Sequence, residues 1–356
     1  MFVAIRDLRF AKGRFALMGA VVTLITMLVV LLSGLTTGLG RGNTSAITDL
    51  PADHLVFSAP AEGQTLAFTD SSIPPSIQHQ WSEVEGVVRA DPVTISMSRA
   101  NADGRIAGVA VFAVPTGSPL APRVAADEVV LTTKAAASLE VAEGDRIDLA
   151  GQTVTVAEVS GSDEFSHAPV IWAANVNAPA SGQEPENVTI LALTTDGADL
   201  AAADRRLGTL TLTPADSLSA IGSYTSENGS LQLMRMLLFA ISALVIGAFF
   251  TVWTVQRSGE IAILKAVGAS TAYLLRDALG QALVLLVIGT TAGTALAAAI
   301  GAAIRTAAGT QIPFVLDLST LLFPAAVMIL LGLVGAAVSL RTVTTVDPLT
   351  ALGSAR

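Results

Sequence analysis

The 356-residue sequence contains no cysteine, little charge and few aromatic side chains. The absence of cysteine excludes disulfides, zinc–thiolate sites and iron–sulfur clusters, although it says nothing about the compartment. Charged residues make up 14% of the chain and aromatic residues 5%, whereas 52% of the residues are hydrophobic. A soluble protein of this length needs a more polar surface, so the composition indicates a membrane protein.

The sequence also lacks a phosphate-binding loop of the form Gly-x4-Gly-Lys-Ser/Thr. Such a loop holds a nucleotide with its backbone N–H groups and its lysine, so this chain cannot hold one in that way. Ser, His and Asp are scattered without the spacing of a catalytic triad. We therefore predict a non-catalytic subunit with no metal or cofactor of its own, and any ATP and Mg²⁺ must be bound by a separate ATPase.

Acidic residues are concentrated in the middle of the chain. Residues 42–229 contain 24 of the 29 acidic residues and 8 of the 20 basic residues, a net charge of −16. The rest of the chain has a net charge of +7. This asymmetry indicates two different environments, and it argues against nucleic acid as a partner of the acidic part.

Four apolar runs are long enough to cross about 30 Å of hydrocarbon as helices. Basic residues in the short flanking segments predict that both termini are cytoplasmic. We expect a multi-pass protein of the cytoplasmic membrane, with four transmembrane α-helices and a mixed α/β extracytoplasmic domain between the first and the second. The predicted segments are a cytoplasmic amphipathic helix (1–14), a first span (15–39), the extracytoplasmic domain (40–230), a second span (231–254), a cytoplasmic coupling loop and helix (255–278), a third span (279–304), a short outer loop (305–315), a fourth span (316–340) and a cytoplasmic tail (341–356).

The N-terminal segment has two interpretations. Residues 1–14 combine four basic residues with apolar residues at helical spacing, which is typical of a helix on the membrane surface. The alternative is the basic start of a signal peptide. The apolar run that follows is longer than a signal-peptide core and has no convincing Ala-x-Ala cleavage site, so we expect a retained membrane helix.

Alternating apolar and polar residues predict short strands within the acidic domain. The predicted strands are 93–97, 105–112, 146–149, 153–156 and 209–212. Two alanine-rich segments, 135–139 and 200–206, predict helices. Residues 175–187 are rich in Asn, Ala, Ser, Gly and Pro and predict a surface loop. In the spans, pairs of small residues four apart allow close helix approach, within one chain or between two copies: Gly34/Gly38, Gly289/Gly293 and Gly332/Ala336.

The segment 257–270 is a short amphipathic stretch between two apolar runs. Glu260 suits the first turn of a helix, Ile261 and Leu264 form an apolar stripe with Gly268, and Gly268 can end the helix. The nearby cationic residues are too few for a strong lipid anchor, so we expect a protein partner. These cationic residues are Arg257, Lys265 and Arg276.

This segment resembles the loop signature of the FtsX/MacB-type ABC transporter permeases, and residues 346–352 are similar to the tail of the same family. The resemblance implies a homodimer of permeases in the lipid membrane, assembled with two copies of a cytoplasmic ABC ATPase. It also implies that the loop 255–278 is the coupling helix. The residues expected to contact the ATPase are Glu260, Ile261, Leu264, Lys265 and Gly268.

The start of the second span carries potential ligands for haem iron. Carboxylate, phenolate and thioether groups can bind haem iron, and arginine suits the haem propionates. Glu227 and Met234 are two helical turns apart and so share a face. We predict Glu227 as the axial ligand, Tyr224 or Met234 in reserve, and Arg235 as the propionate anchor. The alternative is an interfacial collar, with Arg235 extending toward water.

The overall plan also resembles the haem-efflux (HrtB-like) branch of the family, and the segment 167–172 adds a similarity to that branch. The resemblance makes haem the expected transported compound. The three histidines, His54, His79 and His167, fall in the acidic domain, where we interpret them as surface or hydrogen-bonded residues rather than ligands.

Two other functions remain open from the sequence. The same machinery can export an antimicrobial peptide, a macrolide or a lipid, and some family members transmit ATPase motion to a cell-wall enzyme outside the cell. Transport predicts ATPase activity that the substrate stimulates in the isolated complex. Force transmission predicts stimulation only when the protein partner is added.

Reversing the charge of Glu260 together with Leu264→Asp should uncouple the ATPase from transport, because both the first-turn charge and the apolar stripe would be lost. The measurement is substrate-stimulated ATPase activity of the reconstituted complex. Coupling equal to that of the wild type would count against this segment as the ATPase contact.

Overall fold

The computed structural model describes residues 12–122, 124–174, 187–256, 259, 263, 267–308 and 313–344. Parts of four predicted segments lie outside the described residues: 1–11 of the amphipathic helix 1–14, 175–186 of the surface loop 175–187, eight residues of the segment 257–270, and 345–356 of the tail 341–356. The chain forms two compact units. The membrane unit comprises Met1–Gly38 and Ser230–Arg356, and the α/β unit comprises Leu39–Gly229.

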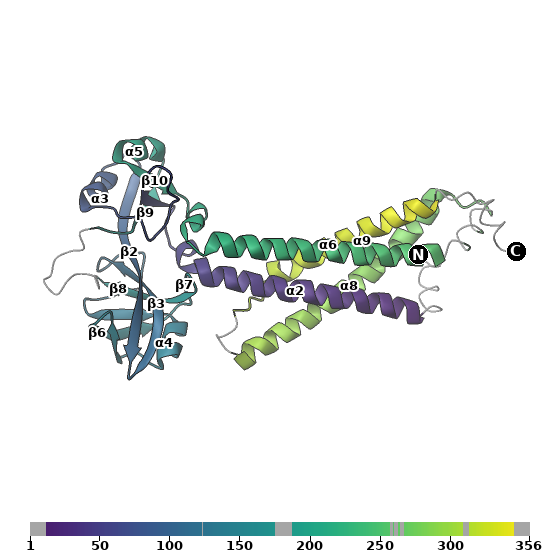
Figure 1. Ribbon diagram of the computed structural model, residues 1–356, viewed down its shortest axis with the longest axis horizontal. Coiled ribbons are helices and arrows are strands. Elements are labelled where there is room, and N and C mark those ends of the chain that lie inside the picture. The colour runs from purple at the N-terminus through teal and green to yellow at the C-terminus, as the bar shows by residue number, and fades with distance from the viewer. Residues whose placement is uncertain are drawn as a thin grey trace. The chain divides into compact units, whose positions relative to one another are not determined.

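Four helices are long and apolar enough to cross a membrane, as the sequence predicted. They are α2 (Lys12–Thr48), α6 (Tyr224–Gln256), α8 (Thr271–Ala308) and α9 (Leu318–Thr344) (Figure 1). All four extend beyond the predicted segments. Helix α2 continues past residue 39, α6 begins before residue 231, α8 begins inside the predicted loop 255–278, and α9 continues past residue 340. Hydropathy marks only the apolar part of a helix, whereas backbone hydrogen bonds continue through the polar turns on either side.

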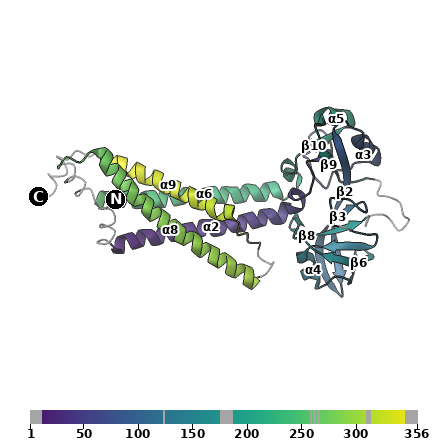
Figure 2. The same cartoon turned by 180° about the vertical axis from the view of Figure 1, so that it is seen from behind.

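Figure 2 shows the helices of the membrane unit from behind. Small residues let these helices approach each other closely. A Cβ atom added at Gly293 of α8 would lie 2.5 Å from the carbonyl oxygen of Thr23 in α2. A Cβ atom added at Gly335 of α9 would lie 3.1 Å from the Cα atom of Gly247 in α6. Other glycines of the predicted small-residue pairs are equally close to neighbouring segments of the same chain: Gly34, Gly38, Gly289 and Gly332. These small-residue pairs therefore allow close contacts between segments of one chain.

The α/β unit contains ten strands and short helices among the described residues. The strands are β1 (His54–Ser58), β2 (Val87–Ala102), β3 (Arg105–Val114), β4 (Glu128–Leu131), β5 (Arg146–Leu149), β6 (Gln152–Val159), β7 (Glu164–Phe165), β8 (Ala168–Ala174), β9 (Ile190–Thr195) and β10 (Thr209–Leu212). The helices are α3 (Pro75–Ser82), α4 (Thr133–Leu139), α5 (Leu200–Leu207) and the 3-10 helix η1 (Asp216–Ala220). All five predicted strands and both predicted helices are confirmed, and the mixed α/β fold with them.

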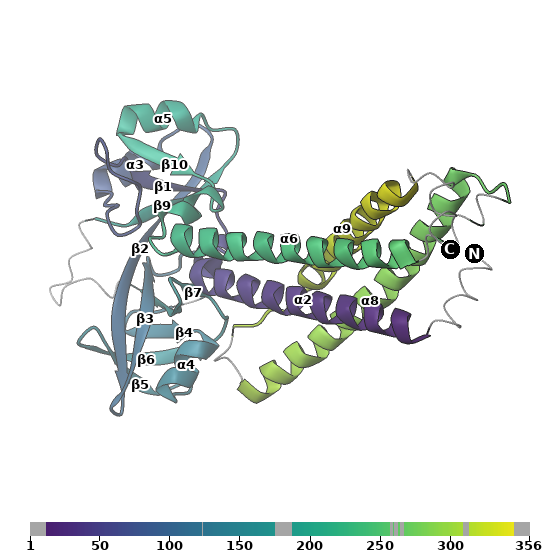
Figure 3. The same cartoon turned by 45° about the vertical axis from the view of Figure 1, so that its right-hand side comes forward.

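The strands form one sheet in the order β10-β1-β9-β2-β3-β8-β4-β6-β5. Strand β5 also pairs with β2, which closes β2, β3, β8, β4, β6 and β5 into a ring. The pairs β3–β8 and β4–β6 are parallel, and the other neighbours in the sheet are antiparallel. Figure 3 shows the long strand β2 passing from the end with α3 and α5 to the end with α4. Strand β2 therefore belongs to both halves of the unit.

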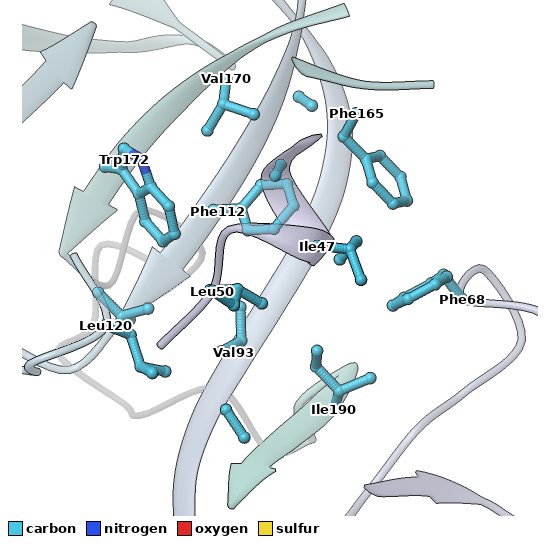
Figure 4. Packing of buried hydrophobic residues seen from close by; sticks show 14 of the residues in the cluster. Ile47, Leu50, Phe68, Val93, Phe112, Leu120, Phe165, Val170, Trp172 and Ile190 are labelled. Atoms are coloured by element: carbon cyan, nitrogen blue, oxygen red, sulfur yellow. The ribbon is translucent and has the colours of Figure 1, made fainter. Parts of the chain in front are cut away.

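Aromatic and aliphatic side chains fill the core where α2 enters the α/β unit (Figure 4). Ile47 and Leu50, from the end of α2, are buried together with Phe112 of β3. The Phe112 ring contacts Phe165 and Trp172, with ring centroids 5.6 and 5.3 Å apart. The Phe112–Phe165 pair is edge-on and the Phe112–Trp172 pair is tilted. An edge-on aromatic pair adds about 0.5–1.5 kcal/mol beyond the burial of its area. The end of α2 is thus anchored in the same core as β7 and β8.

We expect Gly293→Ala to destabilise the membrane unit by about 1–3 kcal/mol, because the new methyl group would overlap the α2 backbone. Gly280→Ala is the matched control, since Gly280 lies in the same helix with no atom within 4 Å of an added Cβ. The measurement is thermal unfolding of the purified protein in detergent. Equal melting temperatures for the two variants would contradict the close contact at Gly293.

Candidate functional site

Glu227 lies in the first turn of α6 and is the acidic residue of that turn. Its backbone N–H donates to the carbonyl oxygen of Ser223, at 3.1 Å, which begins the helical hydrogen bonding. A negative charge in this position is stabilised by the unpaired N–H groups of the helix start. Glu227 thus stands at a helix start, where an acidic side chain suits the helix dipole.

Three segments of the α/β unit meet at the Glu227 carboxylate. Its Oε2 atom accepts a hydrogen bond from Asn43 Nδ2 of α2 at 3.1 Å, and it lies 2.7 Å from His167 Nε2. Asn43 is almost fully buried, at 1% exposure, and also donates to Ser223 Oγ at 3.0 Å. The side chains of His167 and Glu227 are 37% and 42% exposed. These four residues are hereafter the Glu227 cluster: Asn43, His167, Ser223 and Glu227.

His167 is held in place by the tight turn between β7 and β8. The two turn residues, Ser166 and His167, have φ values of 51° and 66°. Left-handed backbone of this kind costs about 1–3 kcal/mol for a residue other than glycine. It is offset here by hydrogen bonds from the N–H groups of Ser166 and His167 to the carbonyl oxygens of Asn43 and Gly42, at 3.0 and 2.9 Å. Docking on α2 therefore stabilises the turn.

The same hairpin has a second polar attachment. Lys134 Nζ of α4 lies 2.5 Å from Glu164 Oε2 of β7, and both side chains are largely buried. The backbone N–H of Glu164 donates to Ser45 Oγ of α2 at 2.8 Å. Phe165, the next residue, is buried in the core. The β7 strand of the hairpin is thus fastened to both α2 and α4.

The structure separates the four predicted haem-site residues into different surroundings. Glu227 joins the Glu227 cluster, whereas Tyr224 packs against the core of the α/β unit. Met234 is half exposed, and the Arg235 guanidinium donates to Gln232 Oε1 at 2.7 Å. These residues lie on one helix, but their described contacts are with different partners.

The sequence predicted a surface or hydrogen-bonded role for His167 but named no partner for it. The structure pairs it with Glu227, although the two residues are 60 positions apart in the sequence. The other histidines have separate partners: His79 lies 3.4 Å from Glu83, and His54 is near Thr195. No local sequence signal connects His167, Asn43 and Glu227, because each lies in a different element.

The predicted ATPase-contact residues Glu260, Ile261, Leu264 and Lys265 lie outside the described residues. Gly268 is described and has a φ value of 103°. Just before it, the N–H of Val267 donates to the carbonyl oxygen of Ile263 at 3.0 Å, which is a helical turn. Gly268 therefore ends a helical turn, as predicted for this position.

A perturbed carboxyl group lies beside the hairpin. Burial raises the pKa of Asp163 above its ordinary value of 3.8, and the negative charge of Asp49 raises it further. A hydrogen bond from the Trp172 side chain lowers the pKa but does not reverse the shift. Asp163 thus holds its proton more tightly in the folded protein than in the unfolded chain.

Two protein families match this chain. Residues 233–348 match the family described as FtsX-like permease C-terminal. Residues 15–210, more than half of the chain, match the family described as MacB-like periplasmic core domain. Together the two matches include residues of all four candidate spans and most of the α/β unit.

Curated relatives match the chain over nearly its whole length. The hemin transport system permease protein HrtB of Staphylococcus haemolyticus (strain JCSC1435), so named putatively, is 26% identical over 366 residues, covering 99% of each chain. The protein of the same name from Staphylococcus epidermidis (strain ATCC 12228 / FDA PCI 1200) is 25% identical over 370 residues, with the same coverage. An uncharacterized ABC transporter permease of Mycobacterium tuberculosis (strain ATCC 25618 / H37Rv) is 24% identical over 367 residues, again covering 99% of each chain.

Solved structures give a weaker similarity. The extracellular domain of the noncanonic ABC-type transporter YknZ from Gram-positive bacteria aligns with 46% of this chain and 100% of its own, at 13% identity and a TM-score of 0.35. The periplasmic region of MacB from Actinobacillus actinomycetemcomitans aligns with 49% of this chain and 95% of its own, at 12% identity and a TM-score of 0.35. A TM-score this low adds nothing to the family matches.

Asp163→Asn should make the protein less sensitive to rising pH. Because the folded pKa of Asp163 is raised, its contribution to the free energy of unfolding is full below about pH 4. That contribution is lost as the pH rises through the folded pKa. The asparagine variant has no such proton to lose. The melting temperature of the variant minus that of the wild type should therefore increase from pH 4 to pH 7.

The measurement is thermal unfolding of the purified protein across this pH range. Glu158→Gln is the control, because Glu158 is an exposed carboxylate on β6. Identical pH profiles for Asp163→Asn and the wild type would contradict the assignment.

Proposed function

Because the chain belongs to the FtsX/MacB-type permeases of ABC transporters, we propose that it is the membrane subunit of an exporter that removes haem from the membrane. The relatives named as hemin transport permeases, which match over 99% of the chain, support haem as the substrate. The sequence has no phosphate-binding loop of its own, so ATP and Mg²⁺ belong to a separate ATPase subunit.

The proposed assembly contains two copies of this chain and two copies of the ATPase. The termini and the loop 255–278 face the cytoplasm, which agrees with the net positive charge outside the acidic domain. The small-residue contacts of the helices are used inside one chain, so lipid and the second copy meet the outward apolar faces instead. Examples of outward side chains are Leu24 and Leu28 of α2, Leu233, Leu237 and Leu244 of α6, and Phe323 and Leu330 of α9.

The observation that carries the haem assignment is the partly exposed Glu227 carboxylate at the start of the second span. Porphyrin nitrogens already occupy four positions around haem iron, so a protein needs to supply only one or two axial ligands. A single carboxylate is therefore sufficient. Among the described residues, no group of three or more His, Asp or Glu side chains is placed to hold a bare metal ion.

The surroundings of Tyr224 and Met234 make them weaker candidates than Glu227 for the axial ligand of haem iron. Tyr224 packs against the core, so iron binding by its phenolate would require that packing to change. Met234 is half exposed two turns farther along α6, where it remains the reserve ligand. Arg235 interacts with a neutral glutamine, which leaves its charge available for a haem propionate.

We expect Glu227→Ala to weaken haemin binding by about tenfold or more and to change the Soret band, because the axial ligand is lost. The measurement is an absorbance titration of the purified protein with haemin in detergent. Glu62→Ala serves as the control, since Glu62 is an exposed carboxylate elsewhere in the α/β unit. A Glu227→Ala variant with the affinity and Soret band of the wild type would eliminate Glu227 as the ligand.

A further inference from the structure

The two donors in the Glu227 cluster contact the same carboxylate oxygen. Asn43 Nδ2 and His167 Nε2 are 3.1 and 2.7 Å from Oε2 of Glu227. A carboxylate held at one oxygen by two donors has little freedom to rotate, and the lone pairs of the other oxygen stay available to a ligand. The cluster therefore fixes the direction of Glu227 before any ligand binds.

We propose that His167 is a positioning residue for haem recognition: it holds Glu227 through Oε2 so that Oε1 is presented to the iron of a metalloporphyrin. This inference rests on the proposed haem-binding function of Glu227. It adds a residue from the extracytoplasmic domain to a ligand site that the sequence placed on α6 alone. Metal ligands are commonly oriented in this way by a second set of hydrogen bonds.

The hydrogen bonds of the cluster assign a donor or an acceptor role to each group. With Glu227 as a carboxylate, Oε2 only accepts, so the hydrogen bond uses the His167 tautomer in which the Nε2–H group donates. The orientation of the Asn43 amide is also fixed by its hydrogen bonds. Its Nδ2 atom donates to both Glu227 Oε2 and Ser223 Oγ, and its Oδ1 atom accepts from Ser223 Oγ at 3.3 Å. Rotation of the Asn43 amide would turn its oxygen toward the carboxylate and replace attraction by repulsion.

The backbone of the hairpin sets the position of His167. The N–H groups of Ser166 and His167 bond to carbonyl oxygens of α2, and Phe165 is buried in the core. The imidazole is therefore carried by a docked turn rather than by a free loop. Since haem affinity would depend on this turn, the docking of the hairpin on α2 becomes part of ligand recognition.

The experiment is an absorbance titration of the full-length protein with haemin, comparing His167→Ala, His167→Gly and His167→Gln with the wild type. His167→Gly removes the imidazole but suits the left-handed backbone at this position, so it guards against a loss of folding. His167→Gln retains a side-chain N–H donor for Glu227. His79→Ala is the matched control, because His79 is also paired with a glutamate in the same unit.

We expect His167→Ala and His167→Gly to bind haemin about 10- to 100-fold more weakly, as for other residues that orient a metal ligand. The Soret position should stay that of the wild type, because Glu227 still binds the iron. His167→Gln should recover most of the affinity, and His79→Ala should match the wild type. Melting temperatures of the apoproteins check that His167→Gly remains folded.

Two results would overturn the inference. If His167→Gly binds haemin as tightly as the wild type while Glu227→Ala does not, then His167 has no positioning role although the ligand assignment stands. If His167→Gly changes the Soret band and Glu227→Ala does not, then His167 is itself the ligand. Unchanged binding by Glu227→Ala would instead refute the proposed function at this site, so the two failures are distinguishable.

Discussion

The arrangement of the candidate site depends on the docking of the β7–β8 hairpin on the end of α2. Two consecutive residues in left-handed conformation, neither of them glycine, are accommodated because their N–H groups reach carbonyl oxygens of the helix. The burial of Phe165 and the Lys134–Glu164 ion pair hold the β7 strand of the hairpin. Without these contacts a turn of this sequence would prefer other conformations, and His167 would have no fixed relation to Glu227.

Helices α2 and α6 each contribute residues to both units of the chain. The last turns of α2 supply Asn43 to the Glu227 cluster and Ile47 to the core, and the first turn of α6 supplies Glu227. A change in the relation of these two helix ends would therefore act directly on the hydrogen bonds of the cluster.

Close contacts between helices of the membrane unit depend on small residues. Lipid offers no hydrophobic driving force for helix association, so packing depends on how near the helix backbones can come. Gly293 and Gly335 allow α8 to approach α2 and α9 to approach α6 within one chain. The predicted small-residue pairs are thus used for contacts within one chain, and the outward faces of the helices carry larger apolar side chains.

The four spans, the strands and the family could be predicted from the sequence because each has a local signal. Long apolar runs identify membrane helices, alternation identifies strands, and a short motif in 257–270 resembles that of the permeases. Hydropathy does not mark where a helix ends, since polar turns continue the same backbone hydrogen bonds. This is why α2 and α8 extend beyond the predicted segments.

Tertiary structure alone decided which side chains meet. Glu227 was a candidate from its place at the start of a span, but its pairing with His167 and Asn43 depends on a sheet, a turn and two helices coming together. Their separation in the sequence leaves no periodicity or spacing to detect. The sequence by itself determined what kind of protein this is, because that depends on local hydrophobicity and motif. The folded chain determined how the carboxylate is held, because hydrogen bonds depend on distances between atoms from remote segments.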